Sequence, residues 1–259
     1  MRNLAILLLL PVAAYLLLCL LLFIGQRSHI YYPVPESNPA GAQSMRLQTG
    51  AADLKVWVVA RPGPRAILYF GGNGEDVARS LTGFEAVFPG HSLYLVNYRG
   101  YGGSSGRPTE AGLQSDAIVL FDHLRQRHAD MAVIGRSLGS GVAVHLASER
   151  PVGRLVLVTP FDSLVAVARE HFRYFPVSLL MRDRYDSASR VPAVRAPVLI
   201  VVAGSDELVS RARSDALAAA FGGARPRVIR IEGAGHNEID GYAQYLESIA
   251  EFLAGAPGV

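Results

Sequence analysis

The sequence has very little of several residue types that mark particular classes of protein. Only one of its 259 residues is cysteine and only one is lysine, Lys55, so arginine supplies nearly all of the positive charge. With Cys19 alone, the chain cannot form an intrachain disulfide. The formal net charge is only +3, and no cluster of arginines interleaved with aromatic residues occurs. The composition therefore predicts no nucleic-acid partner.

Nucleotide-binding and metal-binding patterns are missing as well. The glycine-rich residues 71–74 do not end in G-K-[ST], and residues 98–106 have neither the Rossmann glycine spacing nor an acid at the expected place after it. His123 and His128 are five residues apart, which is poor spacing for two metal ligands on one helix. We therefore expect no metal and no organic cofactor.

What the sequence does have is a long apolar run near its start. Residues 4–25 contain no charge and are dominated by leucine. Such a run exceeds the ~18 residues that indicate a transmembrane helix and can cross a hydrocarbon layer of ~30 Å. A cleaved signal peptide is the rival interpretation, but its apolar region is usually ~7–15 residues long and ends in a small-x-small site, which this run lacks. We expect residues 1–27 to form an uncleaved, single-pass signal anchor.

The charges beside the apolar run predict its orientation. Arg2 and the N-terminal amine lie on one side, and Arg27 and His29 lie on the other. The positive-inside tendency slightly favours a cytoplasmic N-terminus. The domain that follows is then expected on the periplasmic or another extracytoplasmic side of a membrane.

A connector and one domain are expected after the anchor. Residues 28–48 read as the connector, in which Tyr31 and Tyr32 either sit at the membrane interface or pack against the domain. Residues 49–256 contain no further linker, repeat or low-complexity segment. We expect them to form a single domain.

Predicted strands and helices alternate along this domain. Such alternation predicts an α/β fold with a mostly parallel sheet, covered by helices on both faces. In such a sheet the carboxyl ends of the strands meet at one edge, where a site can form. The expected strands are 54–60, 66–70, 92–98, 131–134, 155–159, 198–203 and 227–231, and the expected helices are 76–88, 110–127 with Thr109 as N-cap, 138–148, 210–221 and 242–253.

The G-R-S-L-G motif at residues 135–139 lies between a predicted strand and a predicted helix. In that context G-x-S-x-G indicates a nucleophile elbow, a sharp turn that exposes the serine, here Ser137. Gly135 and Gly139 have no Cβ, so neighbouring backbone can pass close to the turn. The start of the helix near Leu138 offers a free N–H group where an oxyanion would form.

The glycine-rich loop at residues 71–74 follows another predicted strand. In a fold of this type the corresponding loop supplies the second N–H of an oxyanion hole. We expect the two donors to be the backbone N–H groups of Asn73 and Leu138. An ordinary glycine-rich turn is the alternative interpretation.

Two further loops supply a candidate acid and a candidate base. Asp206 follows the strand at 198–203, and His236 follows the strand at 227–231 within a loop of small residues. Glu207 and Asp162 are rival acids, and Asp162 has the alternative role of a helix cap. The order serine, acid, histidine is that of α/β hydrolases. We expect Ser137, Asp206 and His236 to be the catalytic residues.

These stretches together resemble the α/β-hydrolase superfamily. Within it the chain is similar to the membrane-anchored group of Bem46-like proteins and the alpha/beta hydrolase domain-containing proteins of types 12, 13 and 17, often grouped with serine aminopeptidase-like domains. The matching stretches, which extend over nearly the whole chain beyond residue 27, are I-Y-Y-P at 30–33, L-Y-F-G-G-N-G at 68–74, N-Y-R-G-Y-G-G-S at 97–104, G-R-S-L-G at 135–139, P-V-L-I at 197–200, D-E at 206–207 and G-H at 235–236.

The resemblance has one departure and one further implication. The family often has His-Gly-Asn at its oxyanion loop, where this chain has Gly71, Gly72 and Asn73. The donor is a backbone group and is expected to survive the change. The resemblance also implies that residues 98–106 form a structural loop beside the catalytic edge.

The segment at residues 160–197 is where such folds insert a cap. Its length allows one helix and a short apolar cap. Beside a membrane anchor, this cap predicts a serine hydrolase for carboxylic esters or thioesters with acyl or lipid-like groups. A peptidase, or a non-catalytic scaffold tethered to the membrane, are the alternatives. The apolar residues of the segment include Phe172, Tyr174, Phe175, Pro176, Val177, Leu179, Leu180 and Met181.

Overall fold

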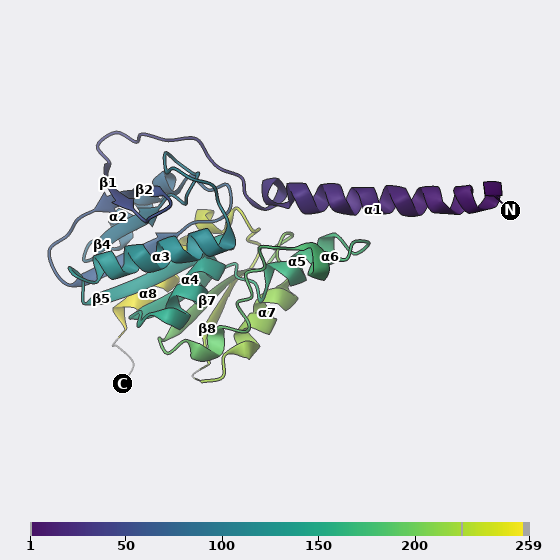
Figure 1. Ribbon diagram of the computed structural model, residues 1–259. Helices are drawn as coiled ribbons and strands as arrows, with labels where there is room; N and C mark the ends of the chain where they lie inside the picture. Colours follow the sequence, from purple (N-terminus) through teal and green to yellow (C-terminus); the bar gives the residue numbers. More distant parts are fainter. Residues whose placement is uncertain (1, 224, 256–259) are drawn as a thin grey trace.

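An eight-stranded sheet forms the centre of the domain (Figure 1). The structure is a computed structural model that describes residues 2–223 and 225–255. The strand order is β1-β2-β4-β3-β5-β6-β7-β8; β3 to β8 run parallel, and β1 and β2 run antiparallel to their neighbours. This confirms the predicted α/β fold. The strands are β1 (Gln43–Gln48), β2 (Asp53–Val59), β3 (Arg65–Phe70), β4 (Ser92–Val96), β5 (Asp130–Arg136), β6 (Arg154–Val158), β7 (Val198–Ala203) and β8 (Arg227–Ile231).

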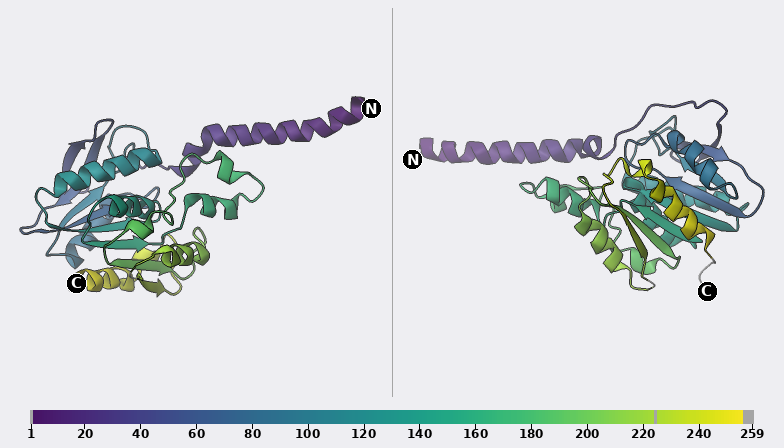
Figure 2. Two further views of the ribbon diagram at one scale, coloured as in Figure 1. Left: turned by 60° about the horizontal axis from the view of Figure 1, so that its bottom comes forward. Right: turned by 180° about the vertical axis from the view of Figure 1, so that it is seen from behind.

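The central strands are buried because helices cover both faces of the sheet. Every residue of β6 and β7 is buried, as expected for parallel strands made almost wholly of Val, Leu, Ile and Ala. Helices α3 (Glu110–Leu124), α4 (Leu138–Glu149) and α7 (Arg211–Ala220) share one hydrophobic core with the first face. Helices α2 (Leu81–Val87) and α8 (Ala243–Ala254) share a second core with the other face, which the right-hand view of Figure 2 shows in front.

Strand register brings four loops to one edge of the sheet. Phe70 at the end of β3 lies opposite Gly135 of β5, and Ala203 at the end of β7 lies opposite Ile231 of β8. The loops that follow β3 and β5 therefore begin side by side, as do the loops that follow β7 and β8, and β6 separates the two pairs. They are the loops that carry Asn73, Ser137, Asp206 and His236.

Several local predictions agree with the structure, and others differ. Thr109 caps α3 as predicted, since its hydroxyl accepts a hydrogen bond from the Gly112 N–H at 3.0 Å. The helix expected over residues 76–88 is instead a 3₁₀ turn (Val77–Ser80) followed by the shorter α2. Strand β1 was not predicted, because it is a half-exposed edge strand with little apolar alternation, in the part of the chain expected as connector.

Helix α1 (Arg2–Ile30) projects from the domain, and a cap lies beside it (Figure 1). By length and composition, Leu9–Ile30 is long and apolar enough to cross a membrane. The cap contains two short helices, α5 (Leu164–His171) and α6 (Val177–Leu180), where one was expected. A hydrogen bond of 2.9 Å from the Tyr15 hydroxyl to the Tyr174 carbonyl joins α1 to the cap.

Candidate active site

Ser137 stands at the turn between β5 and α4 in a strained conformation. Its φ is 50° and its ψ is −116°, which a non-glycine residue rarely adopts and which recurs at functional sites. A Cβ on Gly139 would lie 2.1 Å from the Phe70 carbonyl oxygen, and one on Gly135 would lie 2.3 Å from the Gly139 carbonyl oxygen. The two glycines therefore permit the close backbone contacts that the motif predicts.

The structure brings Ser137, His236 and Asp206 into one chain of hydrogen bonds. His236 Nε2 lies 2.8 Å from Ser137 Oγ, and His236 Nδ1 lies 2.7 Å from Asp206 Oδ2. The His236 and Asp206 side chains are only 7% and 4% exposed. The other oxygen of Asp206 accepts hydrogen bonds from the N–H groups of Leu208 and Val209. These two bonds hold the carboxylate in place independently of the imidazole.

The two rival acids lie elsewhere. Glu207 is exposed, one residue beyond Asp206. Asp162 pairs with Arg213 at 3.0 Å, and burial raises the pKa of its carboxyl group. Its predicted alternative role as a helix cap is wrong, because the hydroxyl of the next residue, Ser163, caps α5.

The loop after β3 lies against the elbow. A Cβ on Gly72 would be 3.8 Å from that of Ser137. The Gly72 N–H is taken by the Glu75 carboxylate at 2.6 Å. Within the described residues, the backbone N–H groups of Asn73 and Leu138 have no hydrogen-bond acceptor, and both residues line the same cavity as Ser137. Two free donors thus stand beside the serine.

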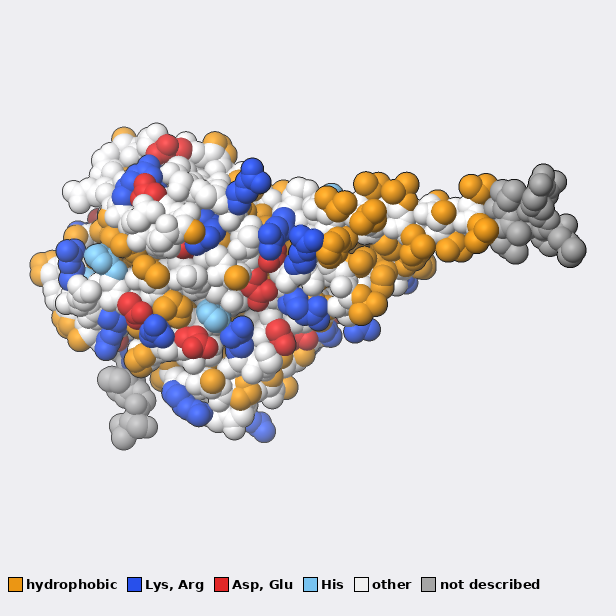
Figure 3. Space-filling view, viewed as in Figure 1, with side chains coloured by type: hydrophobic (Ala, Val, Ile, Leu, Met, Phe, Trp, Pro, Cys, Tyr) orange, Lys and Arg blue, Asp and Glu red, His pale blue; other side chains and the backbone are white. Residues whose placement is uncertain are grey.

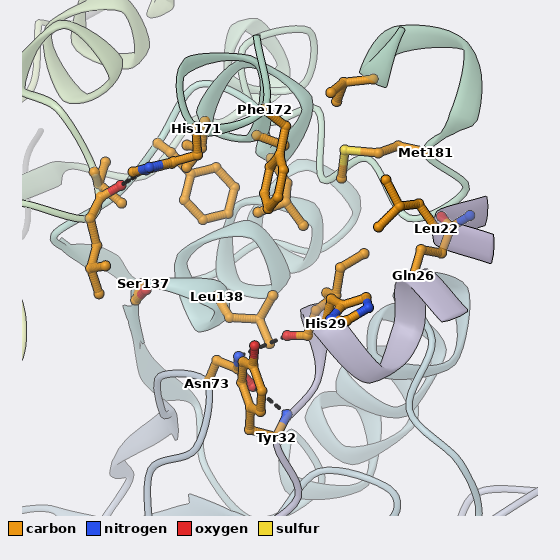
Figure 4. A pocket seen from close by; sticks show the side chains of 18 of the residues that line it. Leu22, Gln26, His29, Tyr32, Asn73, Ser137, Leu138, His171, Phe172 and Met181 are labelled. Atoms are coloured by element: carbon orange, nitrogen blue, oxygen red, sulfur yellow. Dashed lines mark hydrogen bonds between the residues drawn. The ribbon is translucent and has the colours of Figure 1, made fainter. Parts of the chain in front are cut away.

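The side chain of Asn73 holds its loop in place, which sequence reasoning missed. Its Oδ1 accepts from the Tyr32 N–H at 2.9 Å (Figure 4). The same oxygen accepts from the Tyr101 hydroxyl at 2.9 Å, and the Nδ2 donates to the Ile30 carbonyl at 2.7 Å. These partners come from the end of α1, the residues after it and the loop after β4. The sequence did carry a signal for these contacts, because Asn73 and its three partners all lie within the stretches that match the family.

The two tyrosines of the connector differ in exposure. Tyr31 is 3% exposed, and its hydroxyl is 2.9 Å from that of Tyr185, so it packs against the domain. Tyr32 is 56% exposed and lines the cavity. Packing against the domain, one of the two alternatives, is therefore correct for Tyr31.

A buried charged network beneath the site was also missed. Arg136, the second residue of the elbow motif, is 7% exposed and donates to the Asn237 carbonyl at 2.9 Å. Its guanidinium also lies 3.7 Å from the Glu75 carboxylate, which accepts from the Tyr69 hydroxyl at 2.6 Å. Burial, with the nearby Glu75 charge, raises the pKa of Tyr69, so this hydroxyl stays a donor. The network joins the elbow to the loops of Asn73 and His236.

The loop at residues 98–106 supports the site from the side. The Tyr98 hydroxyl donates to the Gly71 carbonyl at 2.7 Å. Gly102 has a φ of +51°, and a Cβ there would lie 2.0 Å from the side-chain oxygen of Asn97. The loop contacts the protein backbone around the candidate oxyanion loop, as a structural element would.

A cavity of about 570 Å³ opens above Ser137 (Figure 4). Apolar side chains from α1, the cap and the loop after β7 form most of its wall. His29 and His171, which no motif singled out, also line it. In the described part of the chain, no group of three or more His, Cys, Asp or Glu side chains could hold a metal ion. The apolar lining includes Leu22, Ile30, Leu164, Phe172, Phe175, Val177, Leu180, Met181 and Leu208.

This arrangement has the parts needed for acyl transfer. An imidazole within 2.8 Å of a hydroxyl can remove its proton, and a carboxylate on the far nitrogen fixes the tautomer that does so. Free N–H groups next to the serine can bind a developing oxyanion.

Comparisons with known proteins find similarity to hydrolases. The model of the serine hydrolase family matches residues 110–254. An uncharacterised protein of Mycobacterium tuberculosis is 36% identical over 247 residues, with 88% of this chain and 87% of the relative covered. Alpha/beta hydrolase domain-containing protein 17C of Xenopus tropicalis is 28% identical, with 90% and 76% covered. An esterase of Pyrococcus furiosus has the same fold, with a TM-score of 0.70, 18% identity, and 86% and 98% of the two chains covered.

Proposed function

The chain belongs to the serine hydrolase family and has the α/β-hydrolase fold, and from this premise we propose that it hydrolyses carboxylic esters or thioesters of acyl, lipid-like substrates. The observation that carries the proposal is the hydrogen-bonded series from Asp206 through His236 to Ser137, next to an apolar cavity. A hydroxyl activated in this way attacks carbonyl carbon, and the cavity wall is suited to an acyl chain.

In the proposed reaction, His236 Nε2 takes the proton of Ser137 as Oγ attacks the substrate carbonyl. Asp206 stabilises the imidazolium that forms. His236 then gives the proton to the leaving alcohol or thiol, and the acyl group remains on Ser137. A water molecule, deprotonated by His236, attacks this acyl-enzyme, and the acid product leaves as Ser137 regains its proton.

The backbone N–H groups of Asn73 and Leu138 bind the oxyanion in both steps. Removing one such donor typically costs about 2.7–4 kcal/mol of transition-state stabilisation. Gly72 does not take part, since its N–H is already bonded to Glu75. The substitution of Gly71 for the family's usual histidine leaves these backbone donors unchanged.

The anchor belongs to the same proposal. We assign residues 1–27 to a single-pass anchor, 28–48 to the connector and 49–256 to the hydrolase domain, with the domain on the periplasmic or another extracytoplasmic side. The contacts of α1 with the domain, such as the Arg27–Asp183 ion pair at 2.8 Å, support retention of the helix. A mature N-terminus beyond Gly25, found by mass spectrometry of the purified protein, would contradict it.

A fluorophosphonate probe tests the proposed chemistry. It should label the wild type and should not label Ser137→Ala or His236→Ala, whereas the matched variant Ser148→Ala should label normally. Ser148 lies on α4, and its hydroxyl only bonds the His145 carbonyl. Labelling of Ser137→Ala at the wild-type rate would overturn the assignment of the nucleophile.

The same experiment separates the hydrolase from a non-catalytic scaffold. If the folded wild type were not labelled and hydrolysed no ester of any chain length, the scaffold alternative would stand. A panel of esters, thioesters and peptides of graded size would then separate an esterase from a peptidase, and the apolar cavity predicts preference for acyl chains.

A further inference from the structure

Helix α1 is docked along the cap and does not simply project from the domain. At one end of the contact, the Tyr15 ring stacks on Phe175 with centroids 6.0 Å apart, and the Tyr15 hydroxyl donates to the Tyr174 carbonyl. At the other end, Arg27 pairs with the buried Asp183 at 2.8 Å. The contact thus follows α1 for twelve residues, about 18 Å at ~1.5 Å per residue.

The contacts between these ends are also specific. Gln26 donates to the Leu180 carbonyl at 3.1 Å and accepts from the Arg182 N–H at 2.7 Å. The Arg182 guanidinium lies 4.1 Å from the centre of the Phe23 ring. The cap is therefore attached to the helix at the levels of Tyr15, Phe23 and Gln26.

The position of these contacts matters because Tyr15 and Phe23 lie inside the apolar run at residues 4–25. A bilayer crossed by α1 surrounds Phe175, which packs against Tyr15, whereas Arg182 packs against Phe23 near the end of the run. The outer surface of the cap suits this location, since Leu179 is 84% exposed and Tyr174 is 81% exposed. Figure 3 shows apolar side chains continuing from the helix onto the adjoining part of the domain.

The exposed charges of the cap are mostly positive, with Asp186 as an exposed carboxylate among them. Glu170 pairs with Arg213, and Asp183 pairs with Arg27. The guanidinium groups of four exposed arginines of the cap pair with no carboxylate within the described residues, although that of Arg184 donates to two carbonyls of the cap. Anionic headgroups attract such cations, and long arginine side chains reach them from beside buried apolar surface. The four are Arg169, Arg173, Arg182 and Arg184.

The cavity above Ser137 is walled partly by the same helix. Leu22, Gln26 and His29 of α1 face Phe172 and Met181 of the cap across it (Figure 4). The anchor is thus part of the substrate-binding surface. Because the cavity lies between α1 and the cap, it borders the medium that surrounds these two elements.

From these observations we propose that the cap is seated in an anionic lipid bilayer beside α1, and that the cavity takes the acyl chain of its substrate directly from the hydrocarbon layer. The substrate class is then a long-chain acyl ester held in a bilayer. This second part rests on the proposed hydrolase function, whereas the seating of the cap does not.

Fluorescence quenching tests the seating of the cap without using activity. The full chain carrying Leu179→Trp is reconstituted in vesicles of phosphatidylcholine and phosphatidylglycerol, with or without lipids brominated on their acyl chains. Val228→Trp on β8 is the matched control, since Val228 is also exposed, at 48%. The native Trp57 is 3% exposed and gives the same background in both proteins.

Emission from Leu179→Trp should be lost with brominated lipid and protected from aqueous acrylamide, and emission from Val228→Trp should behave in the opposite way. Quenching of Leu179→Trp by acrylamide alone would overturn the proposal. The result does not depend on catalysis, so it stands even if the fluorophosphonate probe fails to label Ser137.

A kinetic comparison tests the route of the substrate. Leu179→Asp should lower the ratio of activity on a long-chain ester in vesicles to activity on a short-chain ester in solution by about tenfold, because a carboxylate is expelled from hydrocarbon. Val228→Asp is the control and should leave the ratio unchanged. An unchanged ratio for Leu179→Asp would overturn the entry of substrate from the bilayer.

Discussion

The catalytic edge of the sheet and the cap beside α1 are built in opposite ways. At the edge, buried polar side chains such as His236, Asp206 and Arg136 each find partners within the chain. At the cap, Tyr174 and Leu179 leave large apolar surfaces exposed. The polar groups of the edge are paired within the folded chain, whereas we propose that a bilayer covers the apolar surface of the cap.

This difference teaches where substitutions should act. A change at the catalytic edge breaks a pair whose other member stays buried, so its cost is large and does not depend on the surroundings. Under our proposal, a change at the cap alters a contact with substrate or lipid, so its cost should depend on which substrate and which membrane are offered. The following predictions test this contrast.

The largest effect is expected for Asp206→Asn. The amide would favour the wrong tautomer of His236, and kcat should fall by about 10⁴-fold for short and long esters alike. Steady-state kinetics on both substrates would measure it. Glu207→Gln is the matched control, because Glu207 is exposed beside Asp206, and it should keep near wild-type kcat. A comparable loss of kcat in Glu207→Gln would contradict the assignment of Asp206 as the catalytic acid.

The next effect is on stability. Arg136→Ala would remove one partner of a buried network and should lower the free energy of unfolding by about 3 kcal/mol. Urea unfolding of the full chain in detergent would measure this. Arg150→Ala breaks the exposed pair with Asp122, whose side chains are 33% and 48% exposed, and should cost only about 0–1 kcal/mol. Equal losses in the two variants would contradict the contrast between buried and exposed networks.

Asn73→Ala should act on rate rather than on binding. Its side chain holds the oxyanion loop through three hydrogen bonds, and their loss should lower kcat by about 10–100-fold with little change in KM. Tyr101→Phe removes only one of these bonds and should give a smaller loss of kcat. An unchanged kcat in Asn73→Ala would show that the loop does not need its side-chain contacts.

The smallest effect is expected on the cap side, where only some substrates should respond. Leu22→Trp on α1 would fill part of the cavity and should lower kcat/KM for long-chain esters by about fivefold, with short esters little affected. Leu21→Trp is the control, since Leu21 is 58% exposed on the same helix. Equal effects of both variants on all esters would show that α1 is not part of the substrate-binding wall.

The sequence could predict features that depend on local patterns, but not contacts between residues distant in the chain. Strands β7 and β8 have the predicted bounds, and the elbow and its two partner loops could be located because each follows a strand with its own local pattern. The Arg136–Glu75 contact joins residues far apart in the chain, and no local sequence pattern predicts it. The docking of α1 on the cap was missed for the same reason, since its contacts connect residues more than 150 positions apart.

The bond from Asn73 to the carbonyl of Ile30 has a mechanical consequence. Ile30 is the last residue of α1, so the loop that offers the oxyanion donor is fastened to the end of the helix. A force that tilts or pulls α1 acts on this loop through this hydrogen bond of 2.7 Å and through the bond of 2.9 Å from the Tyr32 N–H, two residues beyond the helix. If α1 crosses a bilayer as we propose, bilayer thickness and lateral tension should therefore affect the turnover rate through this loop.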